Sequence, residues 1–320
     1  MRAFSYDRAS AVADAAGAEA RLIAGGTNLL DLMKLEVELP TRLLDINHVG
    51  LDQITEVEGG LRLGALLRNA DCAADQRVRR DYPLLARAIL AGASPQLRNR
   101  ATTGGNLCQR TRCGYFMRLG TRCNKREPGS GCDAIDGSNR EHAIFGVSPA
   151  CIATYPGDMA VALAALDASV EITGSRGGRS IPLRGFHRLP GDDPSRDNVL
   201  EPGEIITSVT LPPPVGGRQV YRKVRDRASF AFALVSVAAI IDIQSGRISR
   251  ADLAFGGVAH KPWHDPEVEQ ALLGEVPSPV LFARAADLLV AKAKGQGEND
   301  FKIPLLRRSL IAVLAEATGV

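Results

Sequence analysis

The stretch that organises this chain runs from Gln96 to Asp158. It opens with Gln-Leu-Arg-Asn at residues 96–99 and Ala-Thr-Thr-Gly-Gly-Asn at residues 101–106, and it closes with Pro-Gly-Asp at residues 156–158. The glycines suit a close approach of backbone to phosphate or sugar oxygens. Four cysteines lie between the two ends, at Cys113, Cys123, Cys132 and Cys151. The stretch therefore predicts an anion-binding turn together with a thiol site.

The spacing of the four cysteines leaves the nature of that site open. The pattern is C-x9-C-x8-C-x18-C and contains no C-x2-C pair, so it matches neither a zinc ribbon nor a ferredoxin run. Residues 114–150 are rich in Gly, Pro, Asn, Ser and charge, and a loop of this length without a core needs a staple. An iron–sulfur cluster, a zinc ion and a solvated basic loop without metal all fit. Nearby cations would offset thiolate charge: Arg112, Arg118, Arg122, Lys125 and Arg126.

A second glycine-rich turn lies near the N-terminus. Residues 21–24 read as a short apolar strand, Gly25-Gly26-Thr27-Asn28 follows, and residues 29–35 read as a helical turn. A strand, a small-residue loop and a helix start in succession leave backbone N–H groups free to bind a phosphate. A tight turn that merely needs glycine explains the same residues.

Composition excludes several classes of protein. The chain has 320 residues, enough for two or three domains, with 45% hydrophobic and 23% charged residues, as in ordinary globular proteins. The net charge of +3 does not indicate nucleic-acid binding, although residues 95–126 hold eight Lys or Arg and no acidic residue. No apolar run reaches the roughly 20 residues of a membrane span. The start lacks the features of a signal peptide, so a reducing compartment and metal ligation are favoured over disulfides.

The distribution of predicted elements indicates an α+β fold, because short strands mix with helices without regular alternation. Helices are predicted over residues 11–20, 69–93, 159–167, 280–294 and 305–317, and a buried strand over residues 230–243. Pro212-Pro213-Pro214 is the clearest domain boundary. Cys72, in a helical region, and Cys108, beside the second glycine motif, are expected to pack rather than ligate.

The two glycine motifs resemble those of a known family, the FAD-binding (medium) subunits of the xanthine dehydrogenase family of molybdenum hydroxylases. In that family the Gly-Gly-Asn motif runs within a few residues into a Pro just ahead of Asp. Here Pro156 and Asp158 follow after about fifty residues, and the insertion holds the four cysteines. The family commonly has Ser at the position of Gly157, and an aliphatic residue at that of Cys108.

Such an insertion, here about residues 108–151, resembles two branches whose flavoprotein subunit carries an extra [4Fe–4S] cluster. These are the periplasmic aldehyde oxidoreductases and the 4-hydroxybenzoyl-CoA reductases. The aldehyde oxidoreductase subunit is the closer match, on residues 110–113, 123–126, 128–132, 221–229 and 256–263.

The resemblance implies a fold and a set of ligands. Residues 1–214 would form a PCMH-like FAD-binding module of two subdomains, and residues 219–320 an α+β domain of the CO dehydrogenase flavoprotein type. The cluster ligands would be Cys113, Cys123, Cys132 and Cys151. The implied cofactor-binding residues are Ile23, Ala24, Gly25, Gly26, Thr27, Asn28, Leu29, Leu30, Ala101, Thr102, Thr103, Gly104, Gly105, Asn106, Asp158 and Lys223. Asp158 would accept a ribityl hydroxyl, and Lys223 would place charge near the flavin ring unless it is an exposed strand lysine.

The resemblance also implies an electron-transfer role within a heterotrimer, with no catalytic residue on this chain. A molybdenum-cofactor large subunit would oxidise an aldehyde, a small subunit with [2Fe–2S] clusters would pass the electrons to FAD, and an external acceptor would take them up. The complex would reach the periplasm folded, through a partner's signal, or remain cytoplasmic. The alternatives are a hydroxybenzoyl-CoA reductase-like or xanthine dehydrogenase-like subunit, an independent flavoenzyme, and a zinc-stapled binding module without catalysis.

Overall fold

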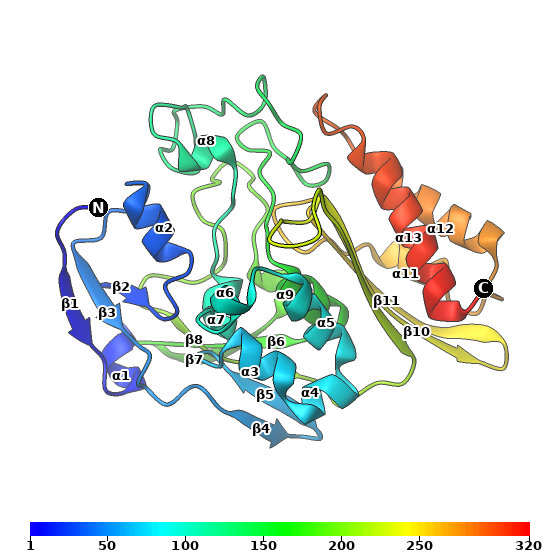
Figure 1. Ribbon diagram of the computed structural model, residues 1–320, viewed down its shortest axis with the longest axis horizontal. Coiled ribbons are helices and arrows are strands. Elements are labelled where there is room, and N and C mark those ends of the chain that lie inside the picture. Colours follow the sequence, from blue (N-terminus) through cyan, green and yellow to red (C-terminus); the bar gives the residue numbers. More distant parts are fainter.

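The computed structural model describes residues 1–320, and its N-terminal part is a small parallel sheet (Figure 1). The strand order is β1-β3-β2, and both pairings are parallel. Two short helices connect the strands, and the second starts directly after the first glycine turn. The elements are β1 (Ser5–Arg8), α1 (Val12–Ala15), β2 (Arg21–Ile23), α2 (Leu29–Lys34) and β3 (Arg42–Asp45).

A five-stranded antiparallel sheet of order β4-β5-β8-β6-β7 forms the centre of the molecule. Short helices cover it and carry the second glycine motif. The strands are β4 (Ile54–Val57), β5 (Gly60–Gly64), β6 (Ser169–Gly174), β7 (Gly177–Pro182) and β8 (Ile205–Leu211). The helices are α3 (Asn69–Ala74), α4 (Gln76–Asp81), α5 (Pro83–Ala91), α6 (Pro95–Arg98), α7 (Thr103–Leu107), α9 (Asp158–Ala165) and α10 (Leu183–Phe186).

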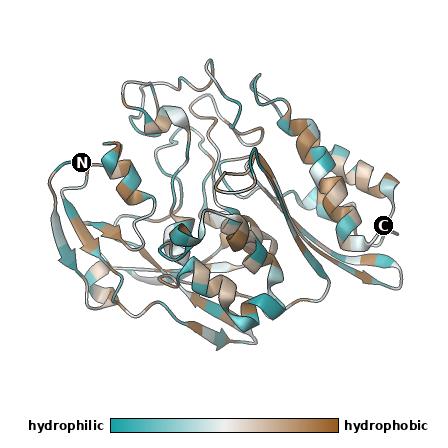
Figure 2. Ribbon diagram, in the orientation of Figure 1, coloured by the Kyte–Doolittle hydropathy of each residue, from teal (hydrophilic) through white to brown (hydrophobic).

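The C-terminal part is an antiparallel sheet of order β11-β10-β9 with helices on one side (Figure 1). Apolar faces of α12 and α13 turn toward this sheet (Figure 2) and complete a core of 25 buried residues. The elements are β9 (Arg218–Val224), β10 (Val235–Gln244), β11 (Arg247–Gly256), α11 (Pro266–Gln270), α12 (Pro279–Val290) and α13 (Lys302–Thr318).

Helix α9 joins the central and C-terminal parts. All eight of its residues are buried, and it packs against α5 on one side and against β10 and β11 on the other. A helix that is apolar all round needs such cover on every side. Its first residue is Asp158, so the packing of α9 holds that carboxylate at the junction between the two parts.

The α+β expectation is confirmed, while several element boundaries differ from it. The helix predicted over residues 69–93 is three helices, because Asp75 caps the start of α4 and Pro83 starts α5. The helix predicted over residues 11–20 ends near Gly17, whose φ is +82°. The strand predicted over residues 230–243 begins only at Val235, after a loop in which Phe230 has a φ of +50°.

The cysteine-bearing insertion forms irregular loops at the top of the view in Figure 1, between the N-terminal and C-terminal parts. Its only helix is α8 (Gly114–Met117). Phe116 of α8 packs with Leu32 of α2 and with Cys123, so the small apolar cluster of this segment is shared with the N-terminal part. No helix of the chain is long and apolar enough to cross a membrane.

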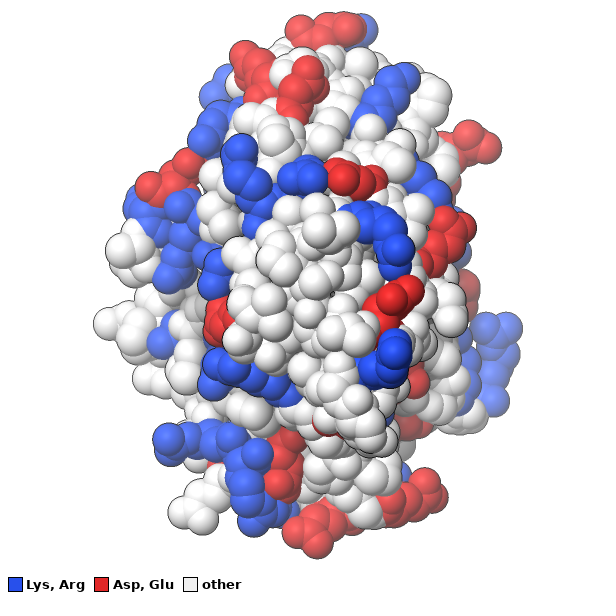
Figure 3. Space-filling model, turned by 90° about the vertical axis from the view of Figure 1, so that its right-hand side faces the viewer, with Lys and Arg blue, Asp and Glu red and all other residues white.

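The face formed by the C-terminal part carries basic and acidic side chains intermingled around a largely uncharged centre (Figure 3). No single sign of charge dominates this face.

Candidate functional site

Both glycine motifs open onto one large cavity of about 1450 Å³. This exceeds the roughly 300–1,000 Å³ of ordinary small-molecule sites, so it suits an extended ligand. The cavity runs between the N-terminal and central parts and reaches the loop of residues 226–232 in the C-terminal part. The residues of the expected cofactor site that line it are Ile23, Ala24, Gly25, Gly26, Thr27, Asn28, Leu29, Ala101, Thr102, Gly104, Gly105, Asn106 and Asp158.

The first glycine turn offers free hydrogen-bond donors to the cavity. The backbone N–H groups of Gly25, Gly26, Thr27 and Asn28 donate to no other backbone group. Gly26 has a φ of +74°, which a residue with a side chain adopts only under strain. A run of unpaired N–H groups ahead of a helix attracts phosphate oxygens, so this turn fits a pyrophosphate.

Glycine is required at residue 25 because two backbone segments touch there, and Gly104 is tightly packed. A Cβ on Gly25 would lie 2.1 Å from the carbonyl oxygen of Arg100, directly before the second motif. A Cβ on Gly104 would lie 3.1 Å from the Cβ of Ala65. The first of these contacts joins the two motifs backbone to backbone, so they form one wall of the cavity.

The second motif differs from the first in that its N–H groups are already used. Thr103 N–H donates to the Leu67 carbonyl at 2.9 Å, Gly104 N–H to the Ala65 carbonyl at 2.8 Å, and Gly105 N–H to the Thr102 hydroxyl at 3.2 Å. This motif therefore contributes to the shape of the cavity wall but offers no free backbone N–H donors at these three residues. Of the expected contacts, Leu30, Thr103 and Lys223 do not line the cavity.

Asp158 sits at the cavity wall in a buried polar cluster. Tyr221 donates its hydroxyl to Asp158 Oδ1 at 2.6 Å, and Lys223 Nζ lies 2.8 Å from Asp158 Oδ2. The Lys223 side chain is 3% exposed, so its interpretation as an exposed strand lysine is wrong. Burial, followed by the Asp158 charge, raises the pKa of Tyr221 well above its ordinary value. The carboxylate is thus held in one orientation by two buried donors.

Packing against a neighbouring ring explains why residue 157 is Gly here, where the family that this sequence resembles commonly has Ser. A Cβ at this position would lie 2.5 Å from the ring of Tyr155. Tyr155 is buried and donates its hydroxyl to the Asn106 carbonyl at 2.9 Å, which ties the end of the insertion back to the second glycine motif. Its ring leaves no room for a side chain at residue 157.

The four cysteines of the insertion come together around one small enclosed cavity. Cys113, Cys123, Cys132 and Cys151 all line it, and none forms a disulfide. Cys123 and Cys132 face each other across a short antiparallel bridge. Residues up to 38 apart in sequence thus share one site. Cys72 is fully buried in the central core and Cys108 borders the large cavity, so neither belongs to this group.

The environment shifts the pKa values of these thiols in opposite directions: that of Cys132 is lowered, and those of Cys113 and Cys151 are raised. Nearby backbone N–H groups lower the pKa of three of these thiols and so partly oppose burial. They belong to Tyr115 and Phe116 beside Cys113, to Ala134, Ile135 and Ile152 beside Cys132, and to Ala153 beside Cys151. A hydrogen bond from Cys151 lowers the pKa of Cys132 to about 6, and burial raises the pKa of Cys113 to about 11. Such N–H donors also surround iron–sulfur clusters, whose potentials they tune.

The thiols do not form a ready site for one ion. No three His, Cys, Asp or Glu side chains are arranged to hold a single metal ion. Tetrahedral zinc, with Zn–S bonds of about 2.3 Å, needs its thiolates within roughly 3.8 Å of one another. The donor set, four thiols around one cavity, has the chemistry that either a zinc ion or an iron–sulfur cluster would use.

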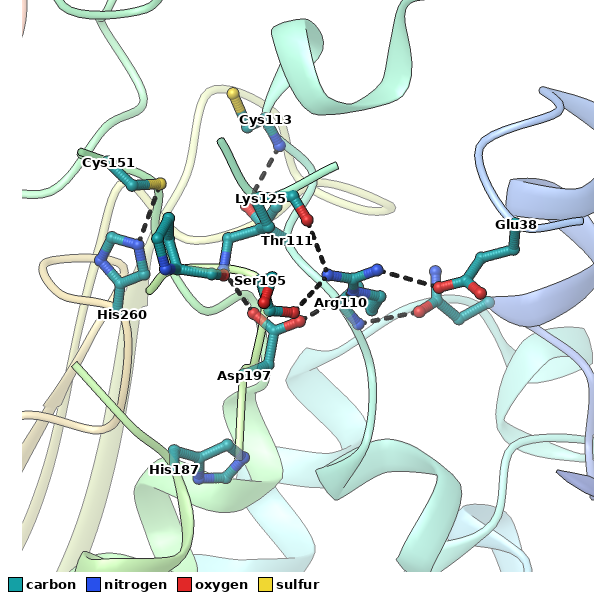
Figure 4. Close-up of polar contacts among 12 residues, drawn as sticks. Glu38, Arg110, Thr111, Cys113, Lys125, Cys151, His187, Ser195, Asp197 and His260 are labelled. Carbon is teal, nitrogen blue, oxygen red and sulfur yellow. Dashed lines mark hydrogen bonds and ion pairs between the residues drawn. The ribbon is translucent and has the colours of Figure 1, made fainter. Parts of the chain in front are cut away.

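A largely buried ion network joins residues that line the thiol cavity and the large cavity, and Figure 4 shows its contacts. Asp197 contacts Lys125 Nζ at 2.6 Å and Arg110 Nε at 2.8 Å, and Arg110 Nη1 contacts Glu38 at 2.9 Å. Burial would raise the pKa of Asp197, but Lys125 and Arg110 lower it overall. Lys125 lines the thiol cavity, while Asp197, Arg110 and Glu38 line the large one. The network therefore ties the insertion to both neighbouring parts of the chain.

Two histidines reach the thiols. His142 Nε2 lies 3.2 Å from Cys113 Sγ, and His260 Nε2 lies 3.3 Å from Cys151 Sγ. They are far from their cysteines in sequence, by 29 and 109 positions. No local pattern in the sequence signals either contact.

Comparison with known proteins is consistent with this geometry. Residues 1–214 match the FAD binding domain in molybdopterin dehydrogenase, and residues 219–317 match the CO dehydrogenase flavoprotein C-terminal domain. The aldehyde oxidoreductase FAD-binding subunit PaoB of Escherichia coli strain K12 is 57% identical, over 99% of each chain. The glyceraldehyde dehydrogenase medium chain of Sulfolobus acidocaldarius is 29% identical, over 85% of this chain and 82% of that one.

The fold also matches a solved structure of carbon monoxide dehydrogenase from Hydrogenophaga pseudoflava. The TM-score is 0.78 at 24% identity, over 99% of this chain and 98% of that one. The two domain matches together span nearly the whole chain, and a cavity with free N–H donors fits the cofactor that the first domain is named for. The chain therefore belongs to the molybdenum hydroxylase family, as its FAD-binding medium subunit.

Proposed function

We propose that this chain is the FAD- and [4Fe–4S]-containing electron-transfer subunit of a heterotrimeric molybdenum aldehyde oxidoreductase. The observation that carries the proposal is the adjacency of the two cavities. Arg112 lines the large cavity, and the next residue, Cys113, lines the thiol cavity. The 57% identity to an aldehyde oxidoreductase subunit, over nearly the full length of both chains, supports the substrate class.

The residues around the large cavity would hold FAD in distinct ways. The free N–H groups of the Gly25–Asn28 turn would bind the pyrophosphate, and Asp158, oriented by Tyr221 and Lys223, has lone pairs left to accept a ribityl hydroxyl. Lys223 adds a buried positive charge behind Asp158. When bound, FAD supplies the step between one-electron carriers and an external acceptor.

The cluster would be held by Cys113, Cys123, Cys132 and Cys151, with Lys125 offsetting part of its negative charge. Because the insertion also has Phe116 and the Asp197 ion network to order it, the cluster is not the only staple of this loop. The domain division at about residue 214, the cofactor contacts and the insertion at residues 108–151 are parts of the same proposal.

The proposed partners are a small subunit with [2Fe–2S] clusters and a large subunit with the molybdenum cofactor, which carries out the aldehyde chemistry. The proposed compartment is the periplasm, reached as a folded complex through a partner's signal. Co-expression with tagged candidate partners tests the assembly: a chain that purifies alone, with no stable complex at any ratio, contradicts it.

The cofactor content is tested by absorbance and metal analysis of the purified chain. We expect one FAD, and about four iron and four sulfide per chain as a [4Fe–4S] cluster requires. A colourless protein that contains zinc would instead support the zinc-stapled binding module without catalysis. Cys132→Ser tests the cluster's role: loss of iron with retained fold and FAD, but collapsed electron transfer, places the cluster in the electron path, and loss of the fold makes it structural.

A further inference from the structure

Two buried histidines each place a ring nitrogen against a sulfur of the thiol cavity. His142 Nε2 is 3.2 Å from Cys113 Sγ, and His260 Nε2 is 3.3 Å from Cys151 Sγ (Figure 4 shows the second pair). Both distances are within hydrogen-bonding range for sulfur. His142 is 6% exposed and His260 is 7% exposed, so water does not compete for either contact.

The direction of these hydrogen bonds follows from the other ring nitrogen. Nδ1 of His142 and Nδ1 of His260 are buried and have no hydrogen-bond partner. A proton on Nδ1 would leave a buried N–H without an acceptor, which is costly. The ring proton therefore belongs on Nε2, where a cysteine sulfur can accept it. A deprotonated sulfur ligand can only accept.

Other groups hold each histidine in place. Lys302 of α13 donates its ammonium to the carbonyl of His142 at 3.0 Å, and Asn299 Nδ2 donates to the same carbonyl at 3.1 Å. The carbonyl next to His260, that of Ala259, accepts the Tyr155 N–H at 2.9 Å. One histidine comes from the insertion and the other from the loop after β11, so the C-terminal part contributes directly to the thiol site.

We propose that His142 and His260 are positioning residues that donate Nε2–H hydrogen bonds to two ligand sulfurs and raise the reduction potential of the [4Fe–4S] cluster; this rests on the proposed function. Four cysteines already supply a full ligand set, so the histidines are not needed as ligands. Reduction adds negative charge to the cluster, and an N–H aimed at a ligand sulfur stabilises the reduced form more than the oxidised form.

The expected size follows from the strength of such a hydrogen bond. Only the part of its energy that differs between the two redox states counts. We expect loss of one donor to lower the reduced-to-oxidised ratio at a fixed poise by roughly threefold to tenfold, a negative shift of about 28 to 59 mV for a one-electron couple. Loss of both donors should give a larger shift than either alone.

The test is a redox titration of the purified complex followed by electron paramagnetic resonance of the reduced cluster. The variants are His142→Leu, His260→Leu and the corresponding His→Gln changes, whose amide N–H restores a donor. His187→Asn is the matched control, because His187 is also buried but bonds the Leu107 carbonyl at 2.9 Å and not a thiol. The Leu variants should shift to lower potential, the Gln variants should recover part of the shift, and the control should match wild type.

Three results would separate the failures. Wild-type protein with far fewer than four irons per chain would overturn the proposed function. Full iron content with unchanged potentials in both Leu variants would overturn this inference alone. If a variant fails to fold, the nitrogen coupling to the reduced cluster is measured instead on wild-type protein with isotope-labelled histidine. Weak coupling supports a hydrogen bond. Strong coupling, as for a direct ligand, or no coupling overturns the inference.

Discussion

Neutralising Asp197 should destabilise the whole protein, because this carboxylate compensates the buried Lys125 and the partly buried Arg110. The Lys125 side chain is 1% exposed and that of Arg110 is 16% exposed, and Asp197 contacts both within 2.8 Å. In Asp197→Asn the amide keeps a hydrogen bond to one of them but no longer offsets either charge. Arg110 retains Glu38 at 2.9 Å, so Lys125 bears most of the loss.

Removing one partner of a buried ion pair typically costs about 3–5 kcal/mol, since the other charge is left uncompensated. For a chain of this size roughly 2 °C of melting temperature corresponds to 1 kcal/mol, so the midpoint should fall by roughly 6–10 °C. The lowered pKa of Asp197 implies that the wild-type contribution is present above the ordinary carboxylate range and is lost as the pH falls through the folded pKa.

The assay is scanning calorimetry of FAD-saturated protein at neutral pH. Asp287→Asn is the matched control, because Asp287 pairs with Arg307 at the surface, and a surface pair contributes at most about 1 kcal/mol. The double variant Lys125→Met with Asp197→Asn should recover much of the lost stability, since it removes the unpaired cation. A drop no larger than that of the control, or a double variant no better than the single one, would refute the reasoning.

Three further outcomes are expected. Gly25→Ala should abolish FAD binding, measured as flavin per chain, since its Cβ would overlap a carbonyl oxygen; Gly216→Ala, with open space around it, should bind normally. Lys302→Met should cost about 1–3 kcal/mol in urea unfolding, because the buried Gly257 carbonyl loses its donor, whereas the His142 and Glu141 carbonyls keep Asn299 and Thr154; an unchanged midpoint would contradict this. Burial lowers the pKa of His187 from 6.5 to about 4, so the unfolded state binds more protons between these values and stability is lost as the pH falls through that window. The free energy of unfolding of His187→Asn should therefore fall by roughly 3 kcal/mol less than that of wild type over this pH range. The measurement is the melting temperature as a function of pH, which should fall less steeply in the variant.

Local chemistry made several features predictable from the sequence alone. The strand, glycine turn and helix start around Gly25 and Gly26 are set by residues adjacent in the chain, and the structure has β2, the turn and α2 at these positions. The α+β class followed from the mixture of short elements. The element boundaries that were wrong depended on single residues, such as Asp75 capping α4 within the predicted helix over residues 69–93.

The opening stretch from Gln96 to Asp158 shows what only the tertiary structure decided. Its residues predict a glycine motif and a thiol site, but the sequence does not tell how far apart in space two residues lie when they are 38 positions apart in the chain. The convergence of the thiols depends on loop packing, on the ion network of Asp197 and on His260, which arrives from another part of the chain. The burial of Lys223 against Asp158 likewise requires α9 to pack between the central and C-terminal parts of the fold. Contacts of this kind arise from many weak packing interactions acting together, so no local pattern encodes them.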